Sequence, residues 1–141
     1  MRVGILGCGY IGLELARQLT DEHEVVGVRR SEDGLAAIEA TGATAVQADI
    51  TDPTDLESIP DVDWLVFTAS SGGRGADAAR RIYVDGLQTV VESFGARDFQ
   101  PAQLVYTSST GVYGDHDGGW VDEATELEPT TGKTRVLAEA E

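Results

Sequence analysis

Short apolar runs recur along this chain and are separated by longer polar or amphipathic stretches. Runs of this length, bounded by Gly, Asp or Thr, are typical of buried β-strands. The pattern predicts five strands, over Arg2–Leu6, Glu24–Val28, Thr44–Gln47, Asp63–Thr68 and Gln103–Thr107. Trp64 belongs to the fourth of them, and we expect it to lie in the core.

The stretches between the strands predict helices. Apolar residues recur at helical spacing over Ile11–Leu19 and over Ala76–Phe94, and the second run stops before Gly95. A shorter helix is expected over Asp33–Thr41, because Gly42 suits a helix end. We also expect a helical turn at Asp55–Ile59, a loop at Gly111–Gly119 and a further helix from Thr131 onward.

Strands and helices therefore alternate along the whole chain. Alternation of this kind predicts right-handed crossovers and a parallel sheet covered by helices on both faces. The expected fold is α/β, a doubly wound Rossmann sheet with strand order 3-2-1-4-5. No internal repeat or linker divides the sequence, so we expect residues 1–141 to form one dinucleotide-binding domain.

A glycine motif, G-x-G-x-x-G, spans residues 7–12 between the first strand and the first helix. In this position Gly7 is expected to make the tight turn, Gly9 to let the backbone approach a pyrophosphate, and Gly12 to allow close helix packing. The free N–H groups of the helix start, at Tyr10 and Ile11, would face the phosphates. The alternative is a glycine-rich turn without a ligand.

The end of the second strand bears on which dinucleotide binds. NAD-binding domains place a carboxylate there to bind the ribose hydroxyls, whereas this chain has Arg29 and Arg30. A guanidinium can bind a 2′-phosphate that a carboxylate would repel. We therefore favour NADP as cofactor, with NAD as the alternative. The two arginines could also be ordinary surface bases.

The net charge of −15 comes from 25 acidic and 10 basic residues, and Lys133 is the only lysine. Such a surface repels nucleic acids and anionic membranes, which are not expected partners. An acidic, lysine-poor composition resembles that of proteins from salt-loving organisms, although the chain could simply be acidic. No stretch approaches the ~20 apolar residues of a membrane span, and we expect a cytoplasmic protein.

Cysteine and histidine add no chemistry to this picture. Cys8 is the only cysteine, so an intramolecular disulfide is excluded, and we expect a small residue that fits the glycine turn. His23 and His116 lie among acidic residues without the spacing of a metal site, and no metal ligands are assigned.

Three further segments carry a family resemblance: Ala48–Asp52 after the third strand, Tyr106–Gly114 after the fifth, and Val121–Glu123. With the glycine motif, they resemble the extended short-chain dehydrogenase/reductases, the NAD-dependent epimerase/dehydratase group. The resemblance implies that Asp49 and Ile50 contact the adenine and that Thr68, Ala69 and Ser70 border the nicotinamide-side ribose. It also implies that Ser109 is the catalytic Ser/Thr.

Each of these assignments has a plainer alternative. Asp49 could cap a turn, the segment 68–70 could be a polar strand end, and Ser109 could satisfy backbone groups of its loop.

The chain departs from the family at the Tyr-x-x-x-Lys pair. A phenol with a pKa of about 10 needs the nearby lysine to act near neutral pH. Thr131 and Arg135 stand at the expected positions, and the residue four before Lys133 is Pro129. This resembles the atypical, tyrosine-less members of the superfamily. The sequence is compatible with two hypotheses. The protein binds a nucleotide without redox catalysis, or it is an oxidoreductase or epimerase that needs a missing C-terminal half or a partner chain.

Family members are considerably longer than this chain and carry the substrate pocket in their second half. We therefore expect the substrate-binding C-terminal part to be absent from these 141 residues. The remaining sheet would have an exposed edge and an uncovered face, which favours a homo-oligomer or a protein partner.

Overall fold

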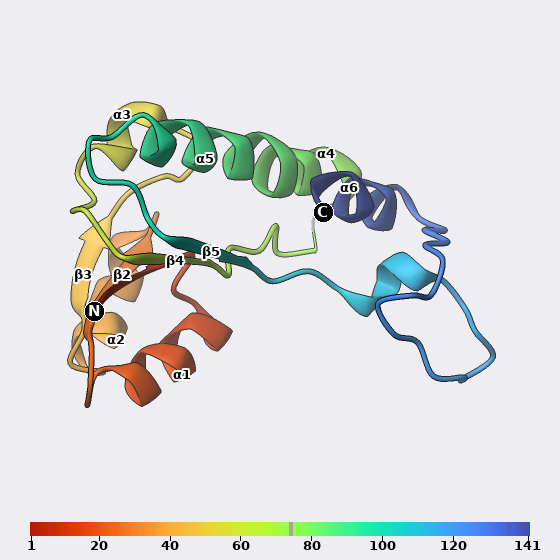
Figure 1. The fold of residues 1–141 in the computed structure, drawn as a ribbon, viewed down its shortest axis with the longest axis horizontal. Helices are drawn as coiled ribbons and strands as arrows, with labels where there is room; N and C mark the ends of the chain where they lie inside the picture. The colour runs from red at the N-terminus through yellow and green to blue at the C-terminus, as the bar shows by residue number, and fades with distance from the viewer. Residues whose placement is uncertain (74) are drawn as a thin grey trace.

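The computed structural model describes residues 1–73 and 75–141, and it shows one five-stranded parallel sheet (Figure 1). The order is β3-β2-β1-β4-β5. This confirms the predicted doubly wound α/β fold and its strand order. The strands are β1 (Arg2–Leu6), β2 (Glu24–Arg29), β3 (Thr44–Gln47), β4 (Trp64–Phe67) and β5 (Gln103–Tyr106).

Helices lie on both sides of the sheet (Figure 1). One side carries α1 (Tyr10–Leu19) and α2 (Leu35–Glu39), which follows the short 3-10 turn η1 (Glu32–Gly34). The other side carries α3 (Pro53–Leu56), α4 (Gly75–Arg80), η2 (Arg81–Gly86), α5 (Leu87–Gly95) and α6 (Gly132–Ala140). Between β5 and α6, a 3-10 turn η3 (Thr110–Tyr113) leads into a segment that projects away from the sheet (Figure 1).

The core consists of two apolar layers, because successive strand residues point to opposite faces of the sheet. Val3, Ile5 and Val66 pack toward α1 and α2. Leu6 and Phe67 pack on the other side, against helix residues such as Val90, Phe94 and Leu137. Residues from the first strand to the last helix therefore contribute to one folded unit.

The helix expected over Ala76–Phe94 is present but is not a regular α-helix. Its central part, η2, is a π-helix that contains Tyr83 and ends at Gly86. A π-helical turn accommodates an extra residue without breaking the run, so hydrophobic spacing does not reveal it. Such turns are frequent at functional sites.

Helix α3 begins earlier than the predicted Asp55. Asp52 is its N-cap and accepts a hydrogen bond from the Thr54 N–H at 2.9 Å, and Pro53 occupies the first turn. Asp followed by Pro is a recognised helix start, and the prediction missed it because no apolar periodicity accompanies it.

The prediction that Trp64 is buried was wrong. Its side chain is 39% exposed at the start of β4, on the face that α1 and α2 cover over β1 and β2. Val105 on β5 lies on the same face and is also 39% exposed. Within residues 1–73 and 75–141, no helix covers this part of the sheet (Figure 1).

None of the helices in the described residues is both long and apolar enough to cross a lipid bilayer.

Candidate functional site

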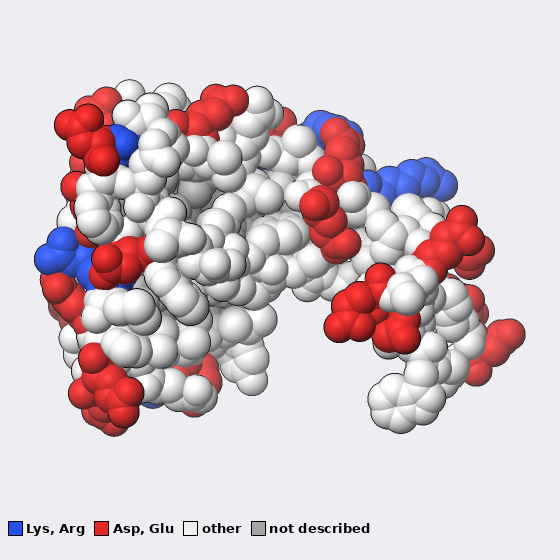
Figure 2. Space-filling view, viewed as in Figure 1, with Lys and Arg blue, Asp and Glu red and all other residues white. Residues whose placement is uncertain are grey.

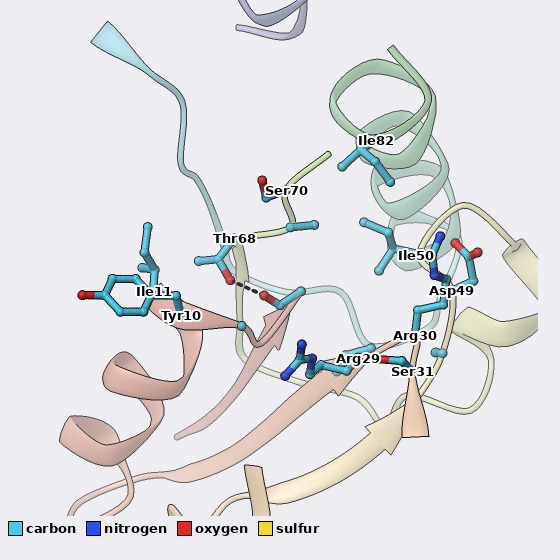
Figure 3. A pocket seen from close by; sticks show the side chains of 15 residues that line it. Tyr10, Ile11, Arg29, Arg30, Ser31, Asp49, Ile50, Thr68, Ser70 and Ile82 are labelled. Atoms are coloured by element: carbon cyan, nitrogen blue, oxygen red, sulfur yellow. Dashed lines mark hydrogen bonds between the residues drawn. The ribbon is translucent and has the colours of Figure 1, made fainter. Parts of the chain in front are cut away.

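A cleft of about 460 Å³ opens at the carboxyl ends of β1, β2, β3 and β4 (Figure 3). Ligands of doubly wound sheets bind at this edge, where the strand order reverses between β1 and β4. Every residue that the sequence assigns to cofactor binding, except Gly12, lines the cleft. The lining consists of Gly7, Gly9, Tyr10, Ile11, Val28, Arg29, Arg30, Ser31, Ala48, Asp49, Ile50, Thr68, Ala69, Ser70 and Ile82.

The glycine turn is set by close packing at two of its three glycines. Gly7 has φ +79°, and a Cβ there would come within 2.5 Å of the Ala69 nitrogen. At Gly12 a Cβ would lie 3.0 Å from Ile5 Cγ2, so this glycine lets α1 approach β1. A Cβ at Gly9 would meet nothing closer than the Gly7 oxygen at 3.7 Å. Gly9 therefore leaves the backbone open toward the cleft.

The amino end of α1 faces the same opening. Gly9 is its N-cap and provides no side-chain hydrogen bond. The first N–H groups of a helix have no partner within the helix, so those of Tyr10 and Ile11 are available to an anion. Both side chains are exposed, at 96% and 58%.

Two arginines follow β2 on the opposite side of the turn. Figure 3 shows Arg29 extending toward the glycine turn and Arg30 directed toward Asp49. The Arg29 side chain packs over Gly34, where a Cβ would lie 2.5 Å from Arg29 Cδ. This rim of the cleft is therefore positively charged.

Asp49 has one carboxylate oxygen engaged and one near arginine. Its Oδ1 accepts hydrogen bonds from the Thr51 N–H at 2.9 Å and from Thr51 Oγ1 at 2.7 Å. Its Oδ2 lies 3.6 Å from Arg81 Nη2. Burial raises the pKa of Asp49, but the Thr51 bonds and the charges of Arg81 and Arg30 outweigh it, so the pKa is lowered. The Asp49 side chain thus caps a turn, which was the plainer alternative, while its Oδ2 faces Arg81.

Thr68 and Ser70 have different surroundings at the end of β4. Thr68 Oγ1 lies 3.2 Å from the Leu6 carbonyl and 3.1 Å from the Gly7 carbonyl, and the bond to Gly7 is dashed in Figure 3. Its hydroxyl therefore holds the glycine turn in place. Ser70 is exposed and accepts a hydrogen bond from the Gly72 N–H at 3.3 Å.

This geometry agrees with the comparison with known protein families. Residues 3–136 match the family described as "NAD dependent epimerase/dehydratase family". The chain belongs to this family. Its Rossmann fold is that of the family, which binds an NAD-type dinucleotide.

Among curated relatives, protein YeeZ of Escherichia coli K12 is 32% identical over 146 residues, covering 99% of this chain and 52% of YeeZ. A conserved protein of unknown function from Silicibacter pomeroyi is 32% identical, with a TM-score of 0.73, and the match covers 99% of this chain and 45% of that one. A UDP-galactose 4-epimerase, 23% identical and 49% covered, shares the fold with a TM-score of 0.82. The chain spans about half the length of these proteins.

The three residues that the resemblance assigns to catalysis are not among those that line the cleft. Ser109 is the N-cap of η3, and its Oγ accepts a hydrogen bond from the Gly111 N–H at 3.2 Å. Thr131 is the N-cap of α6 and forms a reciprocal capping box with Thr134, with bonds of 3.1 and 3.0 Å. Arg135 is exposed on α6. The catalytic assignments of Ser109, Thr131 and Arg135 stay predictions.

Sequence reasoning missed several cleft residues of this family member. Ile82 reaches the cleft from η2, and the neighbouring Arg81 approaches Asp49 to 3.6 Å; both are far along the chain from the loops they meet. No local motif marks them, because their position depends on how the long helix crosses the sheet. Ser31 directly follows the arginine pair and could have been included on that ground.

Cys8 and the histidines contribute no reactive group to the cleft. Cys8 is fully buried, and this burial raises the pKa of its thiol to about 11. The thiol is therefore protonated near neutral pH and is a packing residue. Within residues 1–73 and 75–141, no group of three or more His, Cys, Asp or Glu side chains could hold a metal ion.

Proposed function

We propose that this domain binds NADP in preference to NAD and does not carry out Tyr-x-x-x-Lys redox chemistry on its own. The observation that carries the proposal is the arginine pair at the end of β2, which lines the same cleft as the open glycine turn. No carboxylate stands at that strand end, where an NAD-specific site needs one.

The positions of the cleft residues suggest which part of the nucleotide each of them would contact. The N–H groups at the start of α1 would bind the pyrophosphate, and Arg29 and Arg30 the 2′-phosphate. Asp49 Oδ2 and the backbone of Ile50 would contact the adenine. Ser70 would lie at the nicotinamide side. The bound group would supply hydride transfer, while the chain's own residues bind and orient it.

Calorimetric titration with both nucleotides tests the cofactor preference. One charge-assisted contact contributes about 1.5–3 kcal/mol, so NADP should bind roughly ten- to a hundredfold more tightly than NAD. Arg29→Ala and Arg30→Ala should each reduce that ratio. Arg17→Ala is the matched control, because Arg17 lies on α1 outside this cleft and pairs with Glu14. Equal affinities, or a preference for NAD, would contradict the proposal.

A second candidate function is an oxidoreductase or epimerase acting on a sugar nucleotide or a small carbonyl compound. It is favoured by family membership and by a relative, the uncharacterized sugar epimerase YhfK of Bacillus subtilis, which is 32% identical over 99 residues. Activity of this kind would need groups beyond those lining the cleft, from further chain or from a partner.

The partly covered face of the sheet supports an interaction with protein. Trp64 and Val105 are exposed on the same face of paired strands, at diagonal positions, and large exposed apolar groups of this kind mark contact surfaces. We include a homo-oligomer or a protein partner at this face in the proposal. Sedimentation velocity of the wild type against Trp64→Lys tests self-association, and a monomeric wild type would remove the homo-oligomer. We also propose that the protein is cytoplasmic.

A further inference from the structure

The turn that follows β2 contains a glycine that its own backbone does not require. Gly34 has φ −93° and ψ −10°, a right-handed conformation that residues with side chains also adopt. A glycine in helical conformation is less stable than an alanine, because glycine loses more conformational freedom on folding. The lack of a side chain at position 34 must therefore serve something other than the backbone.

The Arg29 side chain occupies the space that a side chain at position 34 would need. A Cβ at Gly34 would lie 2.5 Å from both Cδ and Cζ of Arg29, and it would also overlap Nε. These atoms join the aliphatic part of the arginine to its guanidinium. Because Gly34 is buried, the bare α-carbon forms a surface on which this part of Arg29 rests.

Both sides of this contact are fixed to the sheet. The Arg29 carbonyl accepts a hydrogen bond from the Ala48 N–H at 3.0 Å, just after β3. On the other side, α2 directly follows Gly34, and a Cβ at Gly27 of β2 would lie 2.6 Å from Cγ2 of the fully buried Ile38 on α2. Helix α2 therefore packs closely against β2, and Gly34 and Arg29 keep their relative position.

The guanidinium held in this way keeps its charge available to a ligand. In residues 1–73 and 75–141 Arg29 forms no ion pair, although Glu32 and Asp33 are exposed in the same turn. Arg29 lines the cleft and extends toward the glycine turn (Figure 3). A flexible side chain that is already ordered before binding lowers the entropy that binding costs.

We propose that Gly34 is a positioning residue for nucleotide selectivity, because it leaves the space in which Arg29 is held ready for the 2′-phosphate of NADP. Gly34 does not line the cleft, so it acts through Arg29. The proposal rests on the proposed function, since it takes Arg29 to be a ligand of that phosphate.

The variant Gly34→Ala separates this role from a role in the fold. The atoms in the way belong to a flexible side chain, so a methyl group at position 34 should displace the guanidinium rather than the backbone. We expect the melting temperature to stay the same or to rise, because alanine suits this conformation better than glycine. The preference for NADP over NAD should fall by roughly tenfold, with the affinity for NAD unchanged.

Calorimetry with both nucleotides, in single and double variants, tests the route. Gly95→Ala is the matched control, because Gly95 ends α5 outside the cleft and a Cβ there would meet nothing within 4 Å. In an Arg29→Ala background Gly34→Ala should leave the preference unchanged, since no guanidinium remains to be displaced. An unaltered preference in Gly34→Ala alone, or an equal loss in both backgrounds, would overturn the proposal.

NMR tests the positioning without any nucleotide, through the ¹H–¹⁵N heteronuclear NOE of the Arg29 Nε–H, assigned with Arg29→Lys. We expect this group to be rigid in the wild type and in Gly95→Ala, and mobile in Gly34→Ala. Equal mobility in all three chains, or a Gly34→Ala chain that does not fold, would overturn the proposal. A wild type with a rigid Arg29 that binds NAD and NADP equally would overturn the proposed function instead, so the two failures are distinguishable.

Discussion

At the scale of single residues, the glycines of the turn have two different roles, one in the fold and one in ligand binding, that the sequence motif does not distinguish. Gly7 is needed by the fold, because its positive φ and its contact with Ala69 exclude any side chain. At Gly9 a Cβ would meet only the Gly7 oxygen, at 3.7 Å, so we expect this glycine to matter for the ligand rather than for the fold. Stability and nucleotide affinity should therefore respond to different substitutions.

We predict that Gly7→Ala destabilises the fold and that Gly9→Ala weakens nucleotide binding. Strained backbone at Gly7 costs about 1–3 kcal/mol, before the clash with Ala69 is counted. Gly9→Ala should change the melting temperature far less, while the added methyl group blocks the pyrophosphate. Thermal melts and calorimetry of both variants measure this. Strong binding by Gly9→Ala would show that the phosphates lie elsewhere.

Single residues differ in how far sequence could predict them. The roles of Gly7 and Gly12 were predictable because steric exclusion is local and depends on the turn itself. The use of Thr131 as a cap was not distinguished from a catalytic role, because a hydroxyl before a helix fits both. The contact of Tyr83 with the end of β4 was not predictable, since only tertiary packing brings the Ser71 N–H to its oxygen.

At the scale of elements, α6 shows what the hydroxyl at position 131, where the resemblance places a tyrosine, does in this structure. Thr131 and Thr134 satisfy each other's backbone N–H groups in a capping box, so the hydroxyl at position 131 stabilises the helix start. The same helix start carries Lys133. Loss of the cap would therefore loosen the element that positions the only lysine of the chain.

We predict that Thr131→Ala lowers the free energy of unfolding by about 0.5–2 kcal/mol, the usual effect of losing an N-cap. Thr131→Ser keeps the capping oxygen and should restore most of the stability. NADP affinity should stay unchanged in both variants, because position 131 does not line the cleft. Urea denaturation and calorimetry measure the two quantities. Unaltered stability in Thr131→Ala would mean that the cap is dispensable.

The strands were more predictable than the long helix that joins β4 to β5. Strand ends follow directly from short apolar runs, and β3 matches its predicted bounds. The π-helical turn in η2 keeps the apolar residues on the buried side, so the sequence reads as an uninterrupted helix. The site residues on this helix were missed for the same reason.

At the scale of the whole molecule, the acidic surface is the dominant property. Figure 2 shows acidic side chains around the rim of this face and on the projecting segment before α6, with few basic groups between them. That segment contains Asp115, Asp117, Asp122, Glu123, Glu126 and Glu128. A net charge of −15 on a chain of 141 residues makes the folded state self-repelling in dilute buffer.

We predict that the melting temperature rises clearly between about 0.1 M and about 2 M KCl, as the Debye length falls from about 10 Å to less than 3 Å. Sucrose at matched osmolality is the control, because it favours the folded state without screening charge. A rise of equal size in sucrose, or a flat curve in KCl, would contradict charge screening and would remove the halophilic interpretation.

We predict that the 141-residue chain binds NADPH without oxidising it faster than buffer when offered aldehydes and ketones. The residues that line the cleft include no Tyr–Lys pair that could give a proton to a carbonyl oxygen. Thr131→Tyr with Arg135→Lys should not create turnover, since neither position lines the cleft. Absorbance of NADPH over time measures this. Turnover by the unmodified chain that Ser109→Ala abolishes would place Ser109 in the reaction.

The Val28 carbonyl accepts hydrogen bonds from both the Gly7 N–H, at 3.1 Å, and the Cys8 N–H, at 2.8 Å. The next residue is Arg29, so the glycine turn is hydrogen-bonded to the peptide group that directly precedes the arginine pair. The glycine turn and the arginine pair would therefore keep their relative position, and the adenosine half of a nucleotide would meet a site that is already formed. Binding would then begin at the adenosine end, and the fragment 2′,5′-ADP would already contain most of the groups that the domain contacts.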